Sequence, residues 1–70
     1  MIQISLNGEL QREDDNCTLA DALVHWQTQG LIGKQYAVAI NGEFIPRSLY
    51  GQKILHNADL VDVVQPIGGG

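Results

Sequence analysis

Two Asn-Gly pairs constrain the fold of this chain more strongly than any other feature. Asn7-Gly8 and Asn41-Gly42 each lie between short runs rich in apolar residues. Asn-Gly in this position is the strongest short-range signal for a β-hairpin, because both central residues of the turn need a positive φ. The sequence therefore predicts one hairpin with strands at 1–6 and 9–12, in which Leu10 points inward, and a second with strands at 36–40 and 43–45.

The segment between the hairpins has the pattern of a helix. Thr18 followed three residues later by Asp21 resembles a capping box, and Gly30 is a natural stop. The apolar residues fall at positions i, i+3, i+4 and i+7 and form one stripe: Leu19, Ala22, Leu23 and Trp26. His25 lies off this stripe, so we expect it on the solvated face. The acidic run 13–16 is predicted to be a solvated turn.

The last apolar run, 60–65, predicts a further strand. Pro46 ends the second hairpin, and 47–57 reads as a loop with a short helical turn that covers one end of the core. On a strand, Val61 and Val63 face one side, and Leu60, Asp62 and Val64 face the other. Such a strand is usually central in its sheet. For Val64 two placements stay open, packed within a central strand or exposed as an apolar contact for a partner.

These elements together predict an α+β domain over 1–65, followed by a tail at 66–70 that we expect to be flexible. A lone main helix must cover one face of a mixed sheet, and the final strand fits best in the middle, beside the first. A right-handed crossover through the helix is consistent with this order. The architecture is the β-grasp, or ubiquitin-like, fold, with four to five strands.

Composition excludes several functions. The 70-residue chain has a net charge of −4 and four scattered Lys and Arg residues, which argues against binding nucleic acid. A body this small offers no substrate pocket of the usual enzyme size, so we expect it to be acted upon. The acidic run lacks the spacing of a calcium loop, so we expect no metal site. No apolar run is long enough to span a membrane and no signal pattern opens the chain, so we expect a cytoplasmic protein.

The single cysteine, Cys17, excludes an internal disulfide and a four-cysteine iron–sulfur cluster. It also points to a reducing compartment. Because Cys17 lies near the start of the predicted helix, the helix dipole could lower its pKa and allow a redox or sulfur-relay role. The alternative is a partly buried small residue that precedes the helix cap.

The sequence ends on Pro66-Ile67-Gly68-Gly69-Gly70. Glycines have no Cβ, so this segment can thread a narrow channel. At about 3.3–3.6 Å per extended residue, it places the α-carboxylate of Gly70, which we expect to be free, about 17 Å from the body. That reach is sufficient to enter a partner's active site. A frayed end, or residues added to the native sequence, is the alternative.

The most specific stretch of the chain is 38–47, Val-Ala-Ile-Asn-Gly-Glu-Phe-Ile-Pro-Arg. It is accompanied by the opening Ile-x-Ile-x-Leu-Asn-Gly-Glu, the Thr-Leu-Ala-Asp-Ala-Leu helix start and the glycine end. With these motifs the whole chain resembles the ThiS family of sulfur carriers in thiamine biosynthesis, whose corresponding stretch is Val-Ala-x-Asn-x-x-x-Val-Pro-Arg. The family ends on Gly-Gly, so Gly68 is an additional glycine that we interpret as harmless.

The resemblance implies that the chain is a protein co-substrate and binds no cofactor itself. A ThiF-like adenylating enzyme would use ATP and Mg²⁺ to activate the Gly70 carboxylate. A persulfide donor would then convert it to a thiocarboxylate, and a ThiG-like thiazole synthase would receive the sulfur. Gly68 and Gly69 would keep the approach unobstructed, and we expect Val64, Pro66 and Ile67 to contact the partner.

Three other functions are open at this stage. A molybdopterin sulfur carrier would share the fold and the glycine tail, although the stretch that ends at Pro46-Arg47 favours the thiamine branch. A ubiquitin-like modifier would transfer its activated glycine to lysine amines, and a plain interaction module would have an inert tail. Arg47 is either a surface residue that follows a strand end or part of the functional site.

Overall fold

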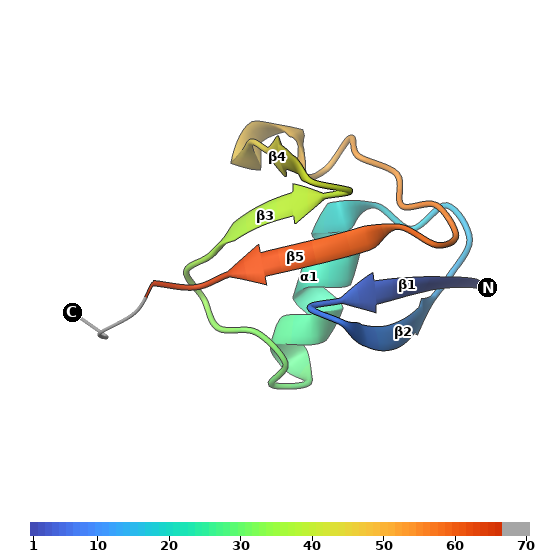
Figure 1. Ribbon diagram of the computed structural model, residues 1–70, viewed down its shortest axis with the longest axis horizontal. Coiled ribbons are helices and arrows are strands. Elements are labelled where there is room, and N and C mark those ends of the chain that lie inside the picture. Colours follow the sequence, from blue (N-terminus) through green and yellow to red (C-terminus); the bar gives the residue numbers. More distant parts are fainter. Residues whose placement is uncertain (67–70) are drawn as a thin grey trace.

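A five-stranded mixed sheet with one α-helix across one face makes up the part of the chain that the computed structural model describes, residues 1–66 (Figure 1). In chain order the elements are β1 (Ile2–Leu6), β2 (Glu9–Glu13), α1 (Leu19–Thr28), β3 (Ala37–Ile40), β4 (Glu43–Ile45), the 3₁₀ helix η1 (Arg47–Leu49) and β5 (Leu60–Val64). This is the predicted β-grasp architecture. Within the described range, α1 is too short and too polar to cross a membrane.

Both predicted hairpins form around their Asn-Gly turns. The φ angles are 51° at Asn7 and 87° at Gly8, and 53° at Asn41 and 83° at Gly42. Positive φ at both central residues matches the right-handed twist of the flanking strands. The turns pair Leu6 with Glu9 and Ile40 with Glu43, which fixes the register of both hairpins.

Strand β5 lies in the middle of the sheet, as predicted. The order is β2-β1-β5-β3-β4, with β5 parallel to β1 and antiparallel to β3. The two turn asparagines also hold β5 through their side chains. Asn7 Oδ1 accepts from the Val63 amide at 2.8 Å, and Asn41 Oδ1 accepts from the Leu60 amide at 2.9 Å. The same two residues therefore close the hairpins and secure the central strand.

The apolar stripe of α1 forms the core with the inner face of the sheet. The helix begins as predicted, because the Asp21 amide donates to Thr18 Oγ1 at 3.1 Å and caps the N-terminus. The four stripe residues are buried and belong to one cluster with the inner side chains of the strands: Leu19, Ala22, Leu23, Trp26, Ile4, Leu6, Val38, Ile40, Ile45, Val61 and Val63. Each such burial contributes about 1.5–3 kcal/mol for a large aliphatic or aromatic side chain.

The predicted cover over residues 47–57 is also present. After η1, Leu55 is buried against the core, and its amide donates to the carbonyl of Cys17 at 2.9 Å. The Leu19 amide donates to the carbonyl of Lys53 at 2.7 Å. This segment therefore covers the end of the core at which α1 begins.

Leu10 does not point inward, so that prediction is wrong. Its side chain is 61% exposed, and the register places it opposite Ser5 on the face of the sheet away from α1. A two-residue turn pairs Leu6 with Glu9, so the inward positions of β2 are Glu9, Gln11 and Glu13. The apolar character of Leu10 misled the prediction, because the turn decides which residues face the core.

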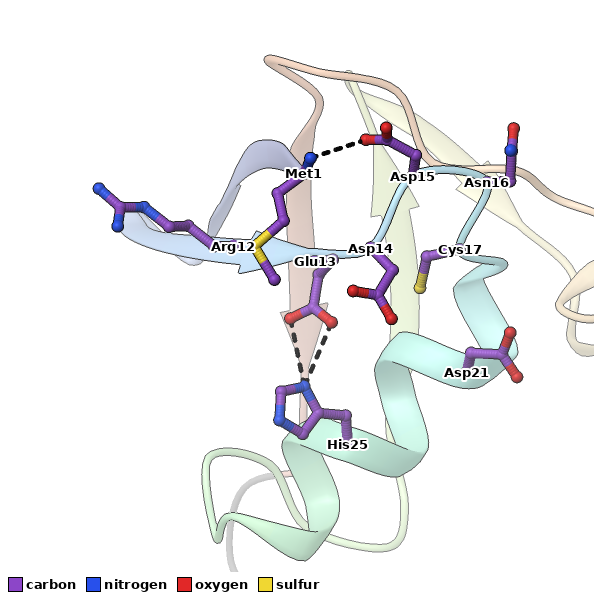
Figure 2. A pocket seen from close by; sticks show the side chains of 9 residues that line it. All are labelled: Met1, Arg12, Glu13, Asp14, Asp15, Asn16, Cys17, Asp21 and His25. Atoms are coloured by element: carbon purple, nitrogen blue, oxygen red, sulfur yellow. Dashed lines mark hydrogen bonds and ion pairs between the residues drawn. The ribbon is translucent and has the colours of Figure 1, made fainter.

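Glu13 is the last residue of β2 and not part of a solvated turn, which corrects a second prediction. Its side chain is only 6% exposed, and Oε2 accepts from the indole Nε1–H of Trp26 at 3.0 Å. His25 Nδ1 lies 3.2 Å from Oε1 (Figure 2). A buried indole N–H needs an acceptor, and the inward position of β2 supplies one. His25 is about half exposed, so the expectation of a solvated ring holds only in part.

We predict that Glu13→Ala lowers the free energy of unfolding by about 1–3 kcal/mol, because the Trp26 N–H is left buried without its acceptor. Denaturant unfolding measures this loss. The matched control is Glu9→Ala at an exposed position of the same strand, with a change within about 0.5 kcal/mol. Equal unfolding midpoints for the two variants would contradict the structural role of Glu13.

Candidate functional site

The chain leaves the domain at the end of β5, where Val64 lies on the open face of the sheet. Val64 is 65% exposed, whereas its neighbour Val63 is 5% exposed. Val64 pairs with Ala37 of β3, whose small side chain leaves it uncovered. Val64 is therefore exposed although its strand is central, and its contact with a partner stays a prediction.

Other apolar side chains share this open face. Phe44 and Leu60 are exposed, and the register places both on the side away from α1, as it does Leu10. The sequence analysis did not identify Phe44 as part of a surface. The signal was available, because the buried Ile45 next to it fixes the opposite orientation for Phe44. Exposed apolar residues gathered on one sheet face are typical of a protein-binding surface.

Gln65, directly after β5, is tied to the α1–β3 connection. The Gly33 amide donates to Gln65 Oε1 at 2.6 Å, and Gln27 Nε2 of α1 donates to the Gly33 carbonyl at 3.3 Å. A Cβ at position 33 would collide with the Gln65 amide oxygen. Glycine at this position therefore allows Gln65 to dock against the α1–β3 connection.

A cleft of about 590 Å³ lies beside Gln65, at the end of β5. Its walls come from the chain that leads into β3, the start of η1 and the end of β5 with the two residues that follow: Lys34, Gln35, Tyr36, Ala37, Arg47, Val64, Gln65 and Pro66. The Tyr36 ring stacks on Tyr50 with centroids 6.4 Å apart. Burial raises the pKa of Tyr50, Tyr36 raises it further, and the Arg47 cation opposes both. Arg47 lines this cleft with an exposed side chain, and its role in the function stays a prediction.

The structure places two of the predicted contact residues, Val64 and Pro66, together at the cleft. Ile67, Gly68, Gly69 and Gly70 lie outside the described residues, so the roles assigned to them stay predictions. The boundary between a domain at 1–65 and a tail at 66–70 also stays a prediction. Lys34, Tyr36 and Gly33 were missed, because only the folded chain brings them to the end of β5.

Cys17 lies in a second hollow, of about 500 Å³, at the far end of the sheet (Figure 2). Its thiol is buried and donates to the Thr18 carbonyl at 3.2 Å. Burial raises the pKa of Cys17, and the carboxylates of Glu13, Asp21 and Asp14 raise it further. Of the two alternatives for Cys17, the structure favours the buried small residue that precedes the helix cap, and a protonated thiol is a poor sulfur relay. In residues 1–66 no three His, Cys, Asp or Glu side chains form a metal site.

Comparison with known proteins identifies the family. A model described as the ThiS family matches residues 3–70. The chain belongs to the ThiS family. Its fold is similar to the crystal structure of the thiamine biosynthesis protein (ThiS) from Geobacter metallireducens, with a TM-score of 0.77 and 20% sequence identity over 99% of this chain and 100% of that chain. A search of curated proteins finds no match.

Membership of the ThiS family makes this chain a small sulfur carrier of thiamine biosynthesis and not a catalyst. It therefore works with sulfur-transfer partners. The geometry fits such a role, because the exposed Val64, the cleft and Pro66 lie together at the end of β5. The name tail root is used below for three consecutive residues of this ThiS-family chain, Val64, Gln65 and Pro66.

We predict that Val64→Asp leaves the fold intact, because substitutions at exposed positions change stability by about 0.5 kcal/mol or less. Val63→Asp is the matched control, since it places an unpaired carboxylate in the core and should unfold the domain. Circular dichroism melts of the two variants measure the difference. Similar losses of structure in both would mean that Val64 is a core residue.

We predict that Gly33→Ala releases Gln65 without unfolding the domain, because the flexible glutamine side chain can move away from the new Cβ. The expected result is faster hydrogen exchange at the residue 33 amide and shifted NMR signals for residues 64–66. Gly51→Ala is the control, since a Cβ there meets nothing within 4 Å. An unchanged exchange rate at position 33 would show that Gln65 does not accept from this amide.

Proposed function

We propose that this protein carries sulfur as a thiocarboxylate on Gly70 and delivers it for synthesis of the thiazole ring of thiamine. The match to the ThiS family, which extends through residue 70, carries the proposal. The position of β5 supports it, because a central strand of the sheet leads directly into the tail beside an exposed apolar face.

The carboxylate needs activation by a partner. A carboxylate resists nucleophiles because it is already anionic, and joining it to AMP removes that charge and supplies a leaving group. We assign this step to a ThiF-like adenylating enzyme that holds ATP and Mg²⁺. The carboxylate of Gly70 attacks the α-phosphate of ATP, pyrophosphate leaves, and a glycyl adenylate forms.

Sulfur then replaces the adenylate. The terminal sulfur of a persulfide donor attacks the activated carbonyl, and AMP leaves with the bonding electrons. A second thiol cleaves the resulting S–S bond and releases the thiocarboxylate. A ThiG-like thiazole synthase receives this sulfur. Cys17 is a free thiol, as in proteins of a reducing compartment, and we propose the cytoplasm as the compartment of this protein.

In this proposal the folded domain serves to bind the partner and to orient the reactive C-terminus. Val64 and Pro66 at the tail root, with Ile67 beyond it, contact the mouth of the partner's channel. Gly68 and Gly69 pass through the narrow part, where a side chain would obstruct entry. The domain supplies binding and orientation, and the partner supplies the catalytic groups.

We predict that deleting Gly70, or adding residues after it, abolishes sulfur loading, because the reacting carboxylate is then absent from its place. The assay is intact-protein mass spectrometry after incubation with the adenylating enzyme, ATP and a persulfide source, and the expected product exchanges one oxygen for sulfur. An N-terminal extension is the matched control, because the N-terminus lies at the other end of the molecule from the end of β5 (Figure 1). Loading of a C-terminally extended protein would overturn the proposal.

The same preparation separates the neighbouring functions. Loaded protein is offered to thiazole synthase and, in parallel, to the large subunit of a molybdopterin synthase. Loss of the sulfur mass only with thiazole synthase supports the proposal, and loss only with the molybdopterin enzyme contradicts it. Isopeptide conjugates of Gly70 in cell extracts would instead assign the protein to the modifier class.

A further inference from the structure

Two of the four Lys and Arg residues of this acidic chain meet at one cleft. Lys34 and Arg47 both line the cleft at the tail root, although 13 positions separate them in the sequence. The residues that line this cleft include no Asp or Glu. Arg12 and Lys53, the other two, line separate hollows elsewhere on the molecule.

Neither cation is neutralised within the described part of the chain. The ion pairs in residues 1–66 join Met1 to Asp15 and His25 to Glu13, and Lys34 and Arg47 take part in neither. Both residues are exposed to solvent. The nearest carboxylate along β5 is Asp62, which lies on the open face opposite Ala39 and is not a cleft residue. Among residues 1–66, the cleft therefore presents two positive charges that take part in no ion pair.

The remaining charges make this end of the molecule distinct. Glu13 pairs with Ile2 at the start of β1, and β1 runs parallel to β5, so the acidic run 13–15 lies at the end opposite the tail root. Figure 1 shows the N-terminus and the end of β5 on opposite sides of the molecule along its long axis. A chain with a net charge of −4 thus has a locally basic end, and it is the end that carries the tail.

The cleft is held in shape before any partner arrives. Arg47 opens η1, where its carbonyl accepts from the Tyr50 amide at 3.1 Å. Tyr36 stacks on Tyr50, with an angle of 17° between the rings, so the segment before β3 and the 3₁₀ helix support each other. Gln65 is fixed by the Gly33 amide on the remaining side. A preorganised site loses less conformational entropy on binding.

We propose that this cleft binds an acidic side chain, Asp or Glu, of the adenylating enzyme and thereby aligns the tail with the active site. The inference rests on the proposed function, which supplies the partner. A guanidinium and an ammonium together favour a carboxylate, and Val64 and Pro66 add apolar walls that suit the surface around it. The charge separation along the molecule orients the approach, so that the tail end meets the partner first.

The test is a charge reversal with a matched control. The variant Lys34→Glu/Arg47→Glu removes the cleft cations, and Arg12→Glu/Lys53→Glu makes the same change in net charge at two other places. Affinity for the adenylating enzyme is measured by titration at low and at high salt, and loading is measured by intact mass. We expect the cleft variant to bind about tenfold more weakly or worse at low salt, with a reduced salt dependence, and the control to stay within about threefold.

Neutral variants keep the test valid if a reversal disturbs folding. Lys34→Gln/Arg47→Gln is compared with Arg12→Gln/Lys53→Gln, and circular dichroism melts confirm that each protein is folded. Equal affinity and equal loading in the cleft and control variants would overturn the inference. If the wild-type protein is never loaded with sulfur, the proposed function itself fails. Equal loading of the wild-type protein and both variants instead refutes only the role of the cleft.

A zero-length carbodiimide crosslinker identifies the occupant directly, because it joins an amine to a carboxylate in contact with it. In the complex with the adenylating enzyme, we expect Lys34 to couple to an Asp or Glu of that enzyme and Lys53 not to couple. Coupling of Lys34 to Gly70 of its own chain would show that the cleft holds the chain's own carboxylate. That result, or coupling at Lys53 alone, would contradict the proposal.

Discussion

Strand β5 has to satisfy two demands at once, because it is the centre of the sheet and also the segment that leads into the tail. Val61 and Val63 bury their side chains under α1, while backbone pairing with β1 and β3 secures both of its edges. Asn7 and Asn41 add side-chain hydrogen bonds to the same strand. The position of the tail root therefore depends on the most firmly held element of the domain.

The alternation of β5 divides the molecule into two working faces. Residues that point toward α1 form the core. Leu60 and Val64, which alternate with them, contribute to the exposed apolar surface on the open face. Charge follows a different axis, with the acidic run at the end of β2 and the cations Lys34 and Arg47 at the tail root. A partner complementary to both the apolar face and the basic end would hold this domain in a single orientation.

The sequence predicted the elements and the topology because its strongest signals are local. An Asn-Gly turn, a capped apolar stripe and an alternating terminal strand each specify their own structure, and one helix leaves few ways to arrange five strands. Leu10 and Glu13 were misassigned because the prediction assumed that the apolar residue of this strand faces the core. In the structure polar residues of β2, Glu13 among them, take the inward positions, and Leu10 faces outward. Glu13 faces inward because the turn sets the register, and its partner, Trp26, is in another element.

The candidate site was predicted only in part, for a related reason. Val64 and Pro66 directly precede the glycine-rich end of the sequence, so the sequence alone was sufficient to suggest them. Lys34 and Tyr36 carry no motif, and they join Arg47 only through the pairing of β3 with β4 and β5. For Cys17 the sequence allowed a reactive thiol or a buried small residue, and burial together with three carboxylates, which raise its pKa, favours the second.

The most direct test of the central claim follows one sulfur atom from this protein into the product. Protein loaded with a heavy sulfur isotope is purified, supplied to thiazole synthase with its other substrates and with unlabelled sulfide in excess, and the thiazole is analysed by mass spectrometry. The account predicts that the ring carries the heavy isotope and that the protein returns to its oxygen form. A ring that contains only unlabelled sulfur, beside protein that keeps its label, would contradict it.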